Sequence, residues 1–209
     1  AMMARGLRAV ALGLLALLGA CSAPDYTPVR DWARSASLVA DHPVAAAGAD
    51  AADGVAAMQE ALATYLLALG RMADDGVLPY LEDPFVTLAA RAGQADAAAG
   101  AAVAAIGATL RRAARGNWQA PELRQSIAVF DPHVQVLADA LAGRVAAEPA
   151  DPARAYYAGL IRQVGAGHAL LKDRAGDITS EDAVQRIRAE EDRLRRAALA
   201  LLRAGAPSR

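Results

Sequence analysis

The apolar residues of segment 54–74 recur in alternating steps of three and four, and this pattern constrains the fold more than any other feature of the sequence. Such spacing forms one stripe on an α-helix, and the stripe must be buried against neighbouring helices. Roughly a quarter of the chain is alanine, the best helix former, and runs of β-branched residues are absent. The sequence therefore predicts an all-α fold, a single-domain antiparallel helical bundle of about five to seven helices. The stripe consists of Val55, Met58, Leu62, Tyr65, Leu69 and Met72, with Leu66 beside it.

Similar stripes predict helices along most of the remaining chain. Asp131 and Pro132 interrupt one of them, and because proline lacks the N–H of a helical hydrogen bond, we expect a kink or restart there with Asp131 as the cap. Gly100 and Gly107 are seven residues apart, which places them on roughly one helix face and would let a neighbour approach closely. The further helices are expected over 28–41, after Asp83–Pro84, and over 95–115, 121–148, 152–171 and 179–201.

The first 20 residues have the composition of a secretory signal peptide. A short basic segment containing Arg5 and Arg8 precedes an apolar run from Ala9 to Ala20, which ends in small residues. This run is too short to cross the hydrocarbon core of a membrane, which needs about 20 residues. We therefore expect residues 1–20 to be removed, and no later stretch is apolar enough to span a membrane.

The segment ends in Leu18, Gly19, Ala20 and Cys21, and Cys21 is the only cysteine of the chain. This tetrapeptide resembles the lipobox of bacterial lipoproteins, a resemblance that covers residues 1–21. It implies cleavage before Cys21 and acyl chains on its sulfur and amine, and two or more chains anchor a protein stably. Ser22 stands where enteric lipoproteins of the inner membrane carry Asp, which implies an outer-membrane, periplasm-facing location. The alternative is an ordinary secretory signal with a chance cysteine.

The expected division of the chain is a signal peptide at 1–20, a lipidated tether at 21–28 and a bundle domain at 29–205. Removal of the signal leaves 20 basic and 23 acidic residues, a net charge of −3. A negative balance argues against a nucleic-acid partner. Because Cys21 has no second cysteine to pair with, we expect neither a disulfide nor a cysteine-based metal site.

No motif for catalysis or for a cofactor occurs in the sequence. The chain has no G-x-S-x-G elbow, P-loop or G-x-G-x-x-G. Its histidines are His42, His133 and His168, which are never three or four residues apart, so only tertiary contact could unite His133 and His168 in a metal site. We therefore expect no enzyme, no metal and no cofactor.

Segment 76–88 is the candidate partner surface. Its apolar residues Leu78, Tyr80, Leu81 and Phe85 could either cover the bundle or present an apolar edge to a partner. Four carboxylates bracket it, at Asp74, Asp75, Glu82 and Asp83, and these could bind a cation or cap helices.

These features predict a membrane-anchored envelope lipoprotein that acts as a helical interaction or scaffold module. Its expected partners are the membrane, through Cys21, and another envelope protein. The alternative is a periplasmic carrier of a small ligand, which would need an apolar cavity inside the bundle.

Overall fold

The computed structural model describes residues 24–43, 49–147 and 152–204, and these form one all-α domain, as predicted. Within these ranges seven α-helices follow one another, with a short 3-10 helix before the fifth. The signal segment 1–20 and Cys21 lie outside the described residues. The first described helix begins at Thr27, inside the segment 21–28 that was expected to be the tether. The elements are α2 (Thr27–Ala40), α3 (Ala49–Ala73), α4 (Val86–Ala95), α5 (Ala97–Arg115), η1 (Ala120–Glu122), α6 (Leu123–Ala146), α7 (Pro152–Asp173) and α8 (Glu181–Ala204).

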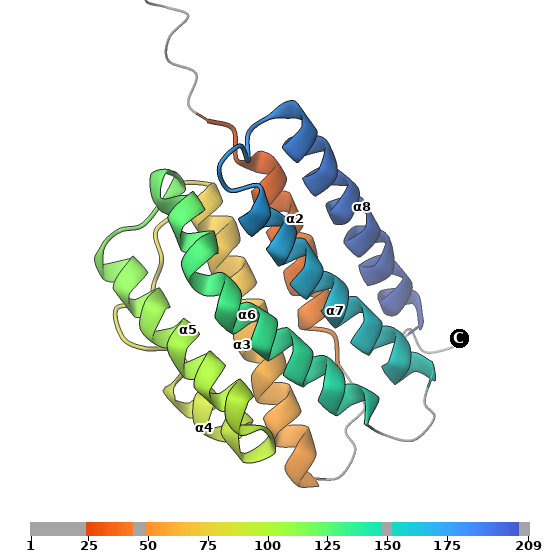
Figure 1. Cartoon of the computed structure of the whole chain (residues 1–209). Coiled ribbons are helices and arrows are strands. Elements are labelled where there is room, and N and C mark those ends of the chain that lie inside the picture. The colour runs from red at the N-terminus through yellow and green to blue at the C-terminus, as the bar shows by residue number, and fades with distance from the viewer. Residues whose placement is uncertain (1–23, 44–48, 148–151, 205–209) are drawn as a thin grey trace, which may run out of the picture.

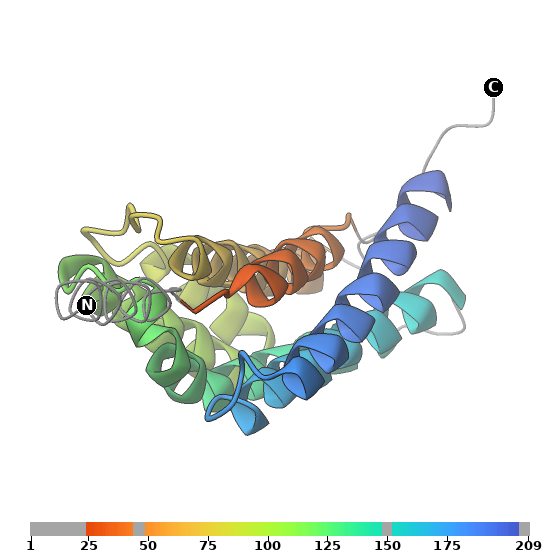
Figure 2. The same ribbon diagram turned by 90° about the horizontal axis from the view of Figure 1, so that it is seen from above.

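Successive helices alternate in direction, which makes the fold an antiparallel bundle (Figure 1). Helix α3 is central and packs against α2, α4, α5 and α6. Helix α8 packs mainly on α2 at the edge of the bundle, and its C-terminal end points away from the other helices (Figure 2). None of the described helices is long and apolar enough to cross a membrane.

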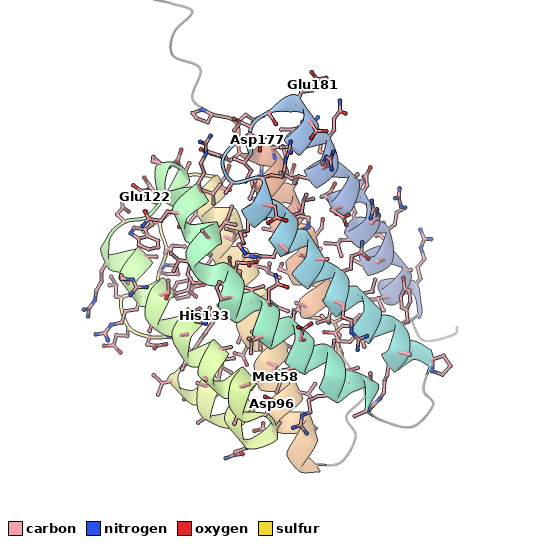
Figure 3. All side chains as sticks on the ribbon, viewed as in Figure 1. Met58, Asp96, Glu122, His133, Asp177 and Glu181 are labelled. Carbon is pink, nitrogen blue, oxygen red and sulfur yellow. The ribbon has the colours of Figure 1, made fainter. Side chains whose placement is uncertain are left out.

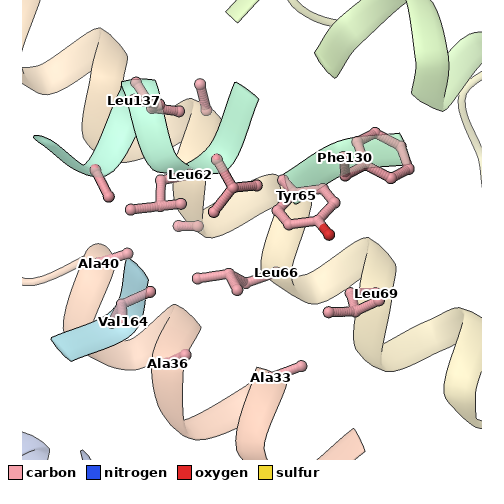
Figure 4. Close-up of a cluster of buried hydrophobic side chains, with 14 of the residues drawn as sticks. Ala33, Ala36, Ala40, Leu62, Tyr65, Leu66, Leu69, Phe130, Leu137 and Val164 are labelled. Carbon is pink, nitrogen blue, oxygen red and sulfur yellow. The ribbon is translucent and has the colours of Figure 1, made fainter. Parts of the chain in front are cut away.

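The stripe on α3 forms the middle of the core, as the heptad-like spacing predicts. Met58, Leu62, Tyr65, Leu69 and Met72 are all fully buried. Alanines of α2 face this stripe, so that α2 and α3 approach closely, while Phe130 and Leu137 of α6 lie on its other side (Figure 4).

Helix α6 is continuous, so the restart that was one of the two expectations at Asp131–Pro132 is wrong. The helix runs from Leu123 to Ala146 with Pro132 in its interior. Proline deprives the carbonyl of Ala128 of its helical partner, but Ala128 is exposed and its carbonyl can bond water instead. Asp131 is not a cap, because it lies buried in the middle of the helix.

The contact between α4 and α5 is a backbone approach, as Gly100 and Gly107 predict. A Cβ on Gly100 would lie 2.6 Å from the Cα of Gly93 in α4. A Cβ on Gly107 would overlap Asp83 and Phe85, which belong to the segment between α3 and α4. Glycine is therefore required at both positions for the packing around α5.

Candidate functional site

A chain of polar side chains crosses the core and joins three helices. His168 of α7 donates from Nδ1 to Asp131 Oδ1 of α6 over 2.9 Å, and its Nε2 accepts from the Tyr65 hydroxyl of α3 over 2.7 Å. The Gln135 amide also donates to Asp131 Oδ1, over 2.9 Å, and to the carbonyl of Gly165. We call Tyr65, Asp131, Gln135 and His168 the core network. Tyr65 and His168 are fully buried, and Asp131 nearly so.

Electrostatics fix the protonation states in the core network. The hydrogen bond from His168 is the main cause that lowers the pKa of Asp131 to about 2, so its carboxylate is charged. Burial lowers the pKa of His168 more than Asp131 raises it, so the ring is neutral near pH 7. Burial raises the pKa of Tyr65, which keeps its hydroxyl protonated and able to donate to Nε2.

A carboxylate, an imidazole and a hydroxyl in series are the groups that activate a nucleophile in hydrolases. Here the hydroxyl belongs to a tyrosine with no exposed surface, packed against Phe130 with ring centroids 4.7 Å apart. The network approaches solvent through Gln135, which is partly exposed, and through Lys172, whose half-exposed side chain places its ammonium 3.3 Å from Asp131 Oδ2. In this arrangement the polar groups satisfy one another and hold three helices in register.

A second polar cluster ties the end of α2 to α3 and α7. The Tyr157 hydroxyl donates to the carbonyl of Ala40 over 2.9 Å and accepts from the Gln59 amide over 2.7 Å. Gln59 also donates to the carbonyl of His42 over 2.7 Å. This bond supplies a partner for a carbonyl just beyond the C-terminal end of α2. Burial raises the pKa of Tyr157, so this hydroxyl is also protonated.

The predicted partner surface is only partly exposed. Phe85 and Leu78 are 0% and 4% exposed and belong to the core, so for these two residues the alternative of covering the bundle holds and the partner surface is wrong. Tyr80 is half-buried, whereas Leu81 is 68% exposed. Segment 76–85 has no helical or strand-like spacing of its apolar residues. Some of them, such as Leu78, cover the core, and others, such as Leu81, face solvent.

The four carboxylates near this segment do not converge on one point. Asp74 pairs with Arg30 and Arg34 of α2, and Asp75 accepts from the backbone N–H of Ala120. Asp83 accepts from the N–H of Phe85 over 2.8 Å, which is the capping role considered from the sequence. In the described part of the chain, no group of three or more His, Cys, Asp or Glu side chains is placed to hold a metal ion.

The histidines do not form the two-histidine site considered from the sequence. His168 is bonded to Asp131 and Tyr65, while His133 lies partly exposed on α6. The role of Asp131 was missed because an Asp–Pro pair is typical of a helix start. A signal was nevertheless present: Asp131 lies four residues after Ile127 and three before Val134, on the apolar stripe of its helix.

Two exposed features remain outside these clusters. Arg111, Arg112 and Arg115 line a pocket of about 240 Å³ with Ala108, near the C-terminal end of α5. Leu38, Tyr156 and Leu199 are large exposed apolar residues at the end of α2, the start of α7 and the end of α8.

Comparison with protein-family models, with curated proteins and with solved structures finds no match for this chain.

Proposed function

We propose that the protein is a lipid-anchored lipoprotein of the outer membrane, facing the periplasm, whose helical bundle acts as an interaction scaffold for another envelope protein. The lipobox-like segment that ends in Cys21 supports the anchor. Helix α2 begins at Thr27, six residues after Cys21, so the linking chain is at most about 20 Å long. The bundle would therefore stand close to the membrane with the start of α2 toward it.

The observation that carries the scaffold role is the exposure of three large apolar side chains near helix ends, Leu38, Tyr156 and Leu199, which we call the patch residues. Leu38 is 63% exposed and lies near the C-terminal end of α2, away from the anchored end. The hydrogen bond from Tyr157 to Ala40 places the start of α7 at the same level, and the end of α8 lies on the same side of the bundle (Figures 1 and 2). Apolar side chains at the far end of a tethered domain are suited to contact a partner.

The surroundings of the patch residues define the chemistry of the partner. Helix α8 carries exposed arginines on the turns before Leu199: Arg193 pairs with Glu190, Arg195 pairs with Glu191 and Asp192, and Arg196 forms no ion pair with another described residue. Apolar residues beside charges of both signs are complementary to a protein surface that is apolar at its centre and charged at its edge. We propose that the scaffold acts without catalysis, since the hydroxyl of Tyr65 and the imidazole of His168 in the core network are fully buried.

The carrier alternative requires an apolar pocket enclosed by helices. The pocket beside Ala108 is open and lined by three arginines, which does not suit an apolar ligand. We therefore propose the scaffold role in preference to the carrier role.

The test places a photocrosslinking residue at Leu38, Tyr156 or Leu199 in cells, with exposed Gln94 of α4 as the matched control position. We expect one discrete adduct with the same outer-membrane or periplasmic protein from at least two patch positions, and none from Gln94. The adduct should weaken in Cys21→Ser, which is released from the membrane fraction. Equal adducts at Gln94, or none at the patch residues, would contradict the scaffold role.

A further inference from the structure

Segment 75–85 runs along the C-terminal half of α5 and forms one continuous surface with it. At one end, Asp75 accepts from the N–H of Ala120, just beyond α5. At the other end, Asp83 and Phe85 lie against Gly107 in the middle of α5. The exposed side chains of the segment therefore flank the exposed face of α5 between residues 108 and 115.

This surface combines apolar and cationic side chains. Val77 and Leu81 are 69% and 68% exposed although they lie in a segment anchored to the core by Leu78 and Phe85. On the half of α5 along which this segment runs, Arg111, Arg112 and Arg115 line the pocket with Ala108. We call Val77, Leu81, Arg111, Arg112 and Arg115 the α5 surface.

The arginines of the α5 surface are free of carboxylate partners in the described part of the chain. Arg112 donates only to Thr109 Oγ1, over 3.1 Å, and Arg111 and Arg115 form no ion pair there. Two other arginines of this end are ion-paired: Arg30 with Asp74, and Arg174 with Asp177 and Asp182. Arg71 of α3 and Arg124 of α6 lie toward the same end and, like the arginines of α5, form no ion pair with another described residue. The three arginines of α5 thus add positive charge to this end without a counter-charge from the described residues.

The α5 surface lies toward the end of the bundle at which α2 begins. The C-terminal end of α5 and the N-terminal end of α2 are on this end in both views (Figures 1 and 2). Acidic residues of the same end lie on both sides of the bundle: Glu122 is near the end of α5, and Glu181 is at the start of α8, across the bundle (Figure 3). Glu122 accepts from the backbone N–H of Gln119 and not from an arginine of α5. A negatively charged plane near this end would therefore attract the unpaired arginines of α5.

We propose that the α5 surface rests on anionic lipid headgroups of the membrane that holds Cys21, with Val77 and Leu81 at the headgroup boundary and the three arginines on lipid phosphates. This inference rests on the lipid anchor of the proposed function, which brings the surface within reach of the bilayer. Arginine suits the role because its guanidinium donates to two phosphate oxygens at once. The contact would fix the orientation of the domain and point Leu38, Tyr156 and Leu199 away from the membrane.

The test measures how close the α5 surface lies to lipid. If Cys21 is acylated its thiol is blocked, so a cysteine introduced as Ala108→Cys is the only one that a fluorophore can label. The processed, labelled protein is reconstituted into vesicles of phosphatidylcholine, alone or mixed with phosphatidylglycerol, that carry a quencher on their headgroups. The variant combines Arg111→Gln, Arg112→Gln and Arg115→Gln. Its matched control combines Arg193→Gln, Arg195→Gln and Arg196→Gln, which removes the same charge from exposed positions of α8.

We expect quenching on phosphatidylglycerol vesicles and little on pure phosphatidylcholine. Each arginine near an anionic surface contributes about fivefold to the contact equilibrium, so the α5 variant should lose most of the quenching and the α8 control none. At about 1 M salt, where the Debye length is about 3 Å, quenching by the wild type should also disappear. Equal quenching on both kinds of vesicle, or in the α5 variant, overturns the proposal. If inorganic phosphate alone changes the fluorescence and displaces the label from vesicles, the arginines bind a free anion and the membrane proposal is wrong.

Flotation and mass separate this inference from the anchor. Acylated protein that floats with both kinds of vesicle, with the label unquenched, contradicts the α5 contact alone. Unacylated protein that floats only with phosphatidylglycerol, and only with its α5 arginines, contradicts the anchor and supports the α5 contact. Unacylated protein that floats with neither contradicts both.

Discussion

The two sides of the bundle bring their helices together by different means. On one side, α3, α6 and α7 meet through directed hydrogen bonds among Tyr65, Asp131 and His168. On the other, α4 and α5 meet by backbone proximity at Gly93 and Gly100. The first arrangement depends on which polar atoms face each other and on their charge, and the second depends on the absence of a side chain. Substitutions of similar size should therefore destabilise the two sides for different reasons: unpaired polar groups on the first side and steric overlap on the second.

The largest effect is expected where a buried charge is removed. In Asp131→Ala, the Nδ1–H of His168 and the amide of Gln135 lose their acceptor inside the core. Breaking a buried network in this way costs about 3 kcal/mol of the free energy of unfolding. Urea unfolding measures this cost, with exposed Asp139→Ala on the same helix as the control. Equal midpoints for the two variants would mean that the network does not stabilise the fold.

The glycine contact predicts the next effect. A Cβ on Gly100 would lie 2.6 Å from the Cα and 2.9 Å from the N of Gly93, so α4 and α5 must separate. Gly100→Ala should therefore lower the free energy of unfolding by about 2 kcal/mol. Gly93→Ala is the internal control, since a Cβ there meets only the Cα of Gly100 at 3.7 Å. If both variants unfold at the same urea concentration, the asymmetry described here is wrong.

A hydroxyl deletion tests the core network without changing its charge. Tyr65→Phe keeps the ring against Phe130 but leaves Nε2 of His168 without a donor. We expect a loss of about 1.5 kcal/mol in unfolding free energy. The same change at exposed Tyr156 should have no measurable effect. An unchanged free energy of unfolding in Tyr65→Phe would show that this hydrogen bond makes no net contribution to stability.

Acid should lower the free energy of unfolding through the core network. The pKa of His168 is lowered in the folded state, whereas in the unfolded chain it is about 6.5. Below that pH, the unfolded chain therefore binds more protons than the folded chain. The free energy of unfolding is therefore not reduced by His168 above about pH 6.5. It falls as the pH decreases below that value, by about 1 kcal/mol over the first pH unit. Asp131, with a pKa of about 2, adds a further loss below about pH 4 in the same direction. Unfolding from pH 7 to 5 should show a slope that His168→Gln lacks, and equal slopes would contradict a neutral buried ring.

The smallest expected effect is a gain. Gly159 lies inside α7 with open space around the position of a Cβ. Gly159→Ala should raise the free energy of unfolding by about 0.5 kcal/mol, since alanine favours the helix. A thermal scan checks this, and a loss of stability would indicate a contact that the structure does not have.

The sequence allowed the helices to be predicted because burial imposes a period that is visible in one segment at a time. The core network is not visible in that way, because Tyr65 and His168 are 103 positions apart and Asp131 and His168 are 37 apart. A helix restart at Pro132 was one expectation from local chemistry, and packing along the whole of α6 overrode it. In segment 76–85 no period exists, so the sequence could not show that Leu78 and Phe85 point inward while Leu81 points outward.

The measurement that tests the account most directly is the mass of the N-terminal peptide of the protein as a bacterial envelope processes it. The account predicts a peptide that begins at Cys21 and carries diacylglycerol and an acyl chain, recovered from the outer membrane. In Cys21→Ser this mass should vanish and the protein should leave that fraction. A wild-type peptide that is cut elsewhere and carries no lipid would contradict the anchor, and with it the orientation of the bundle proposed here.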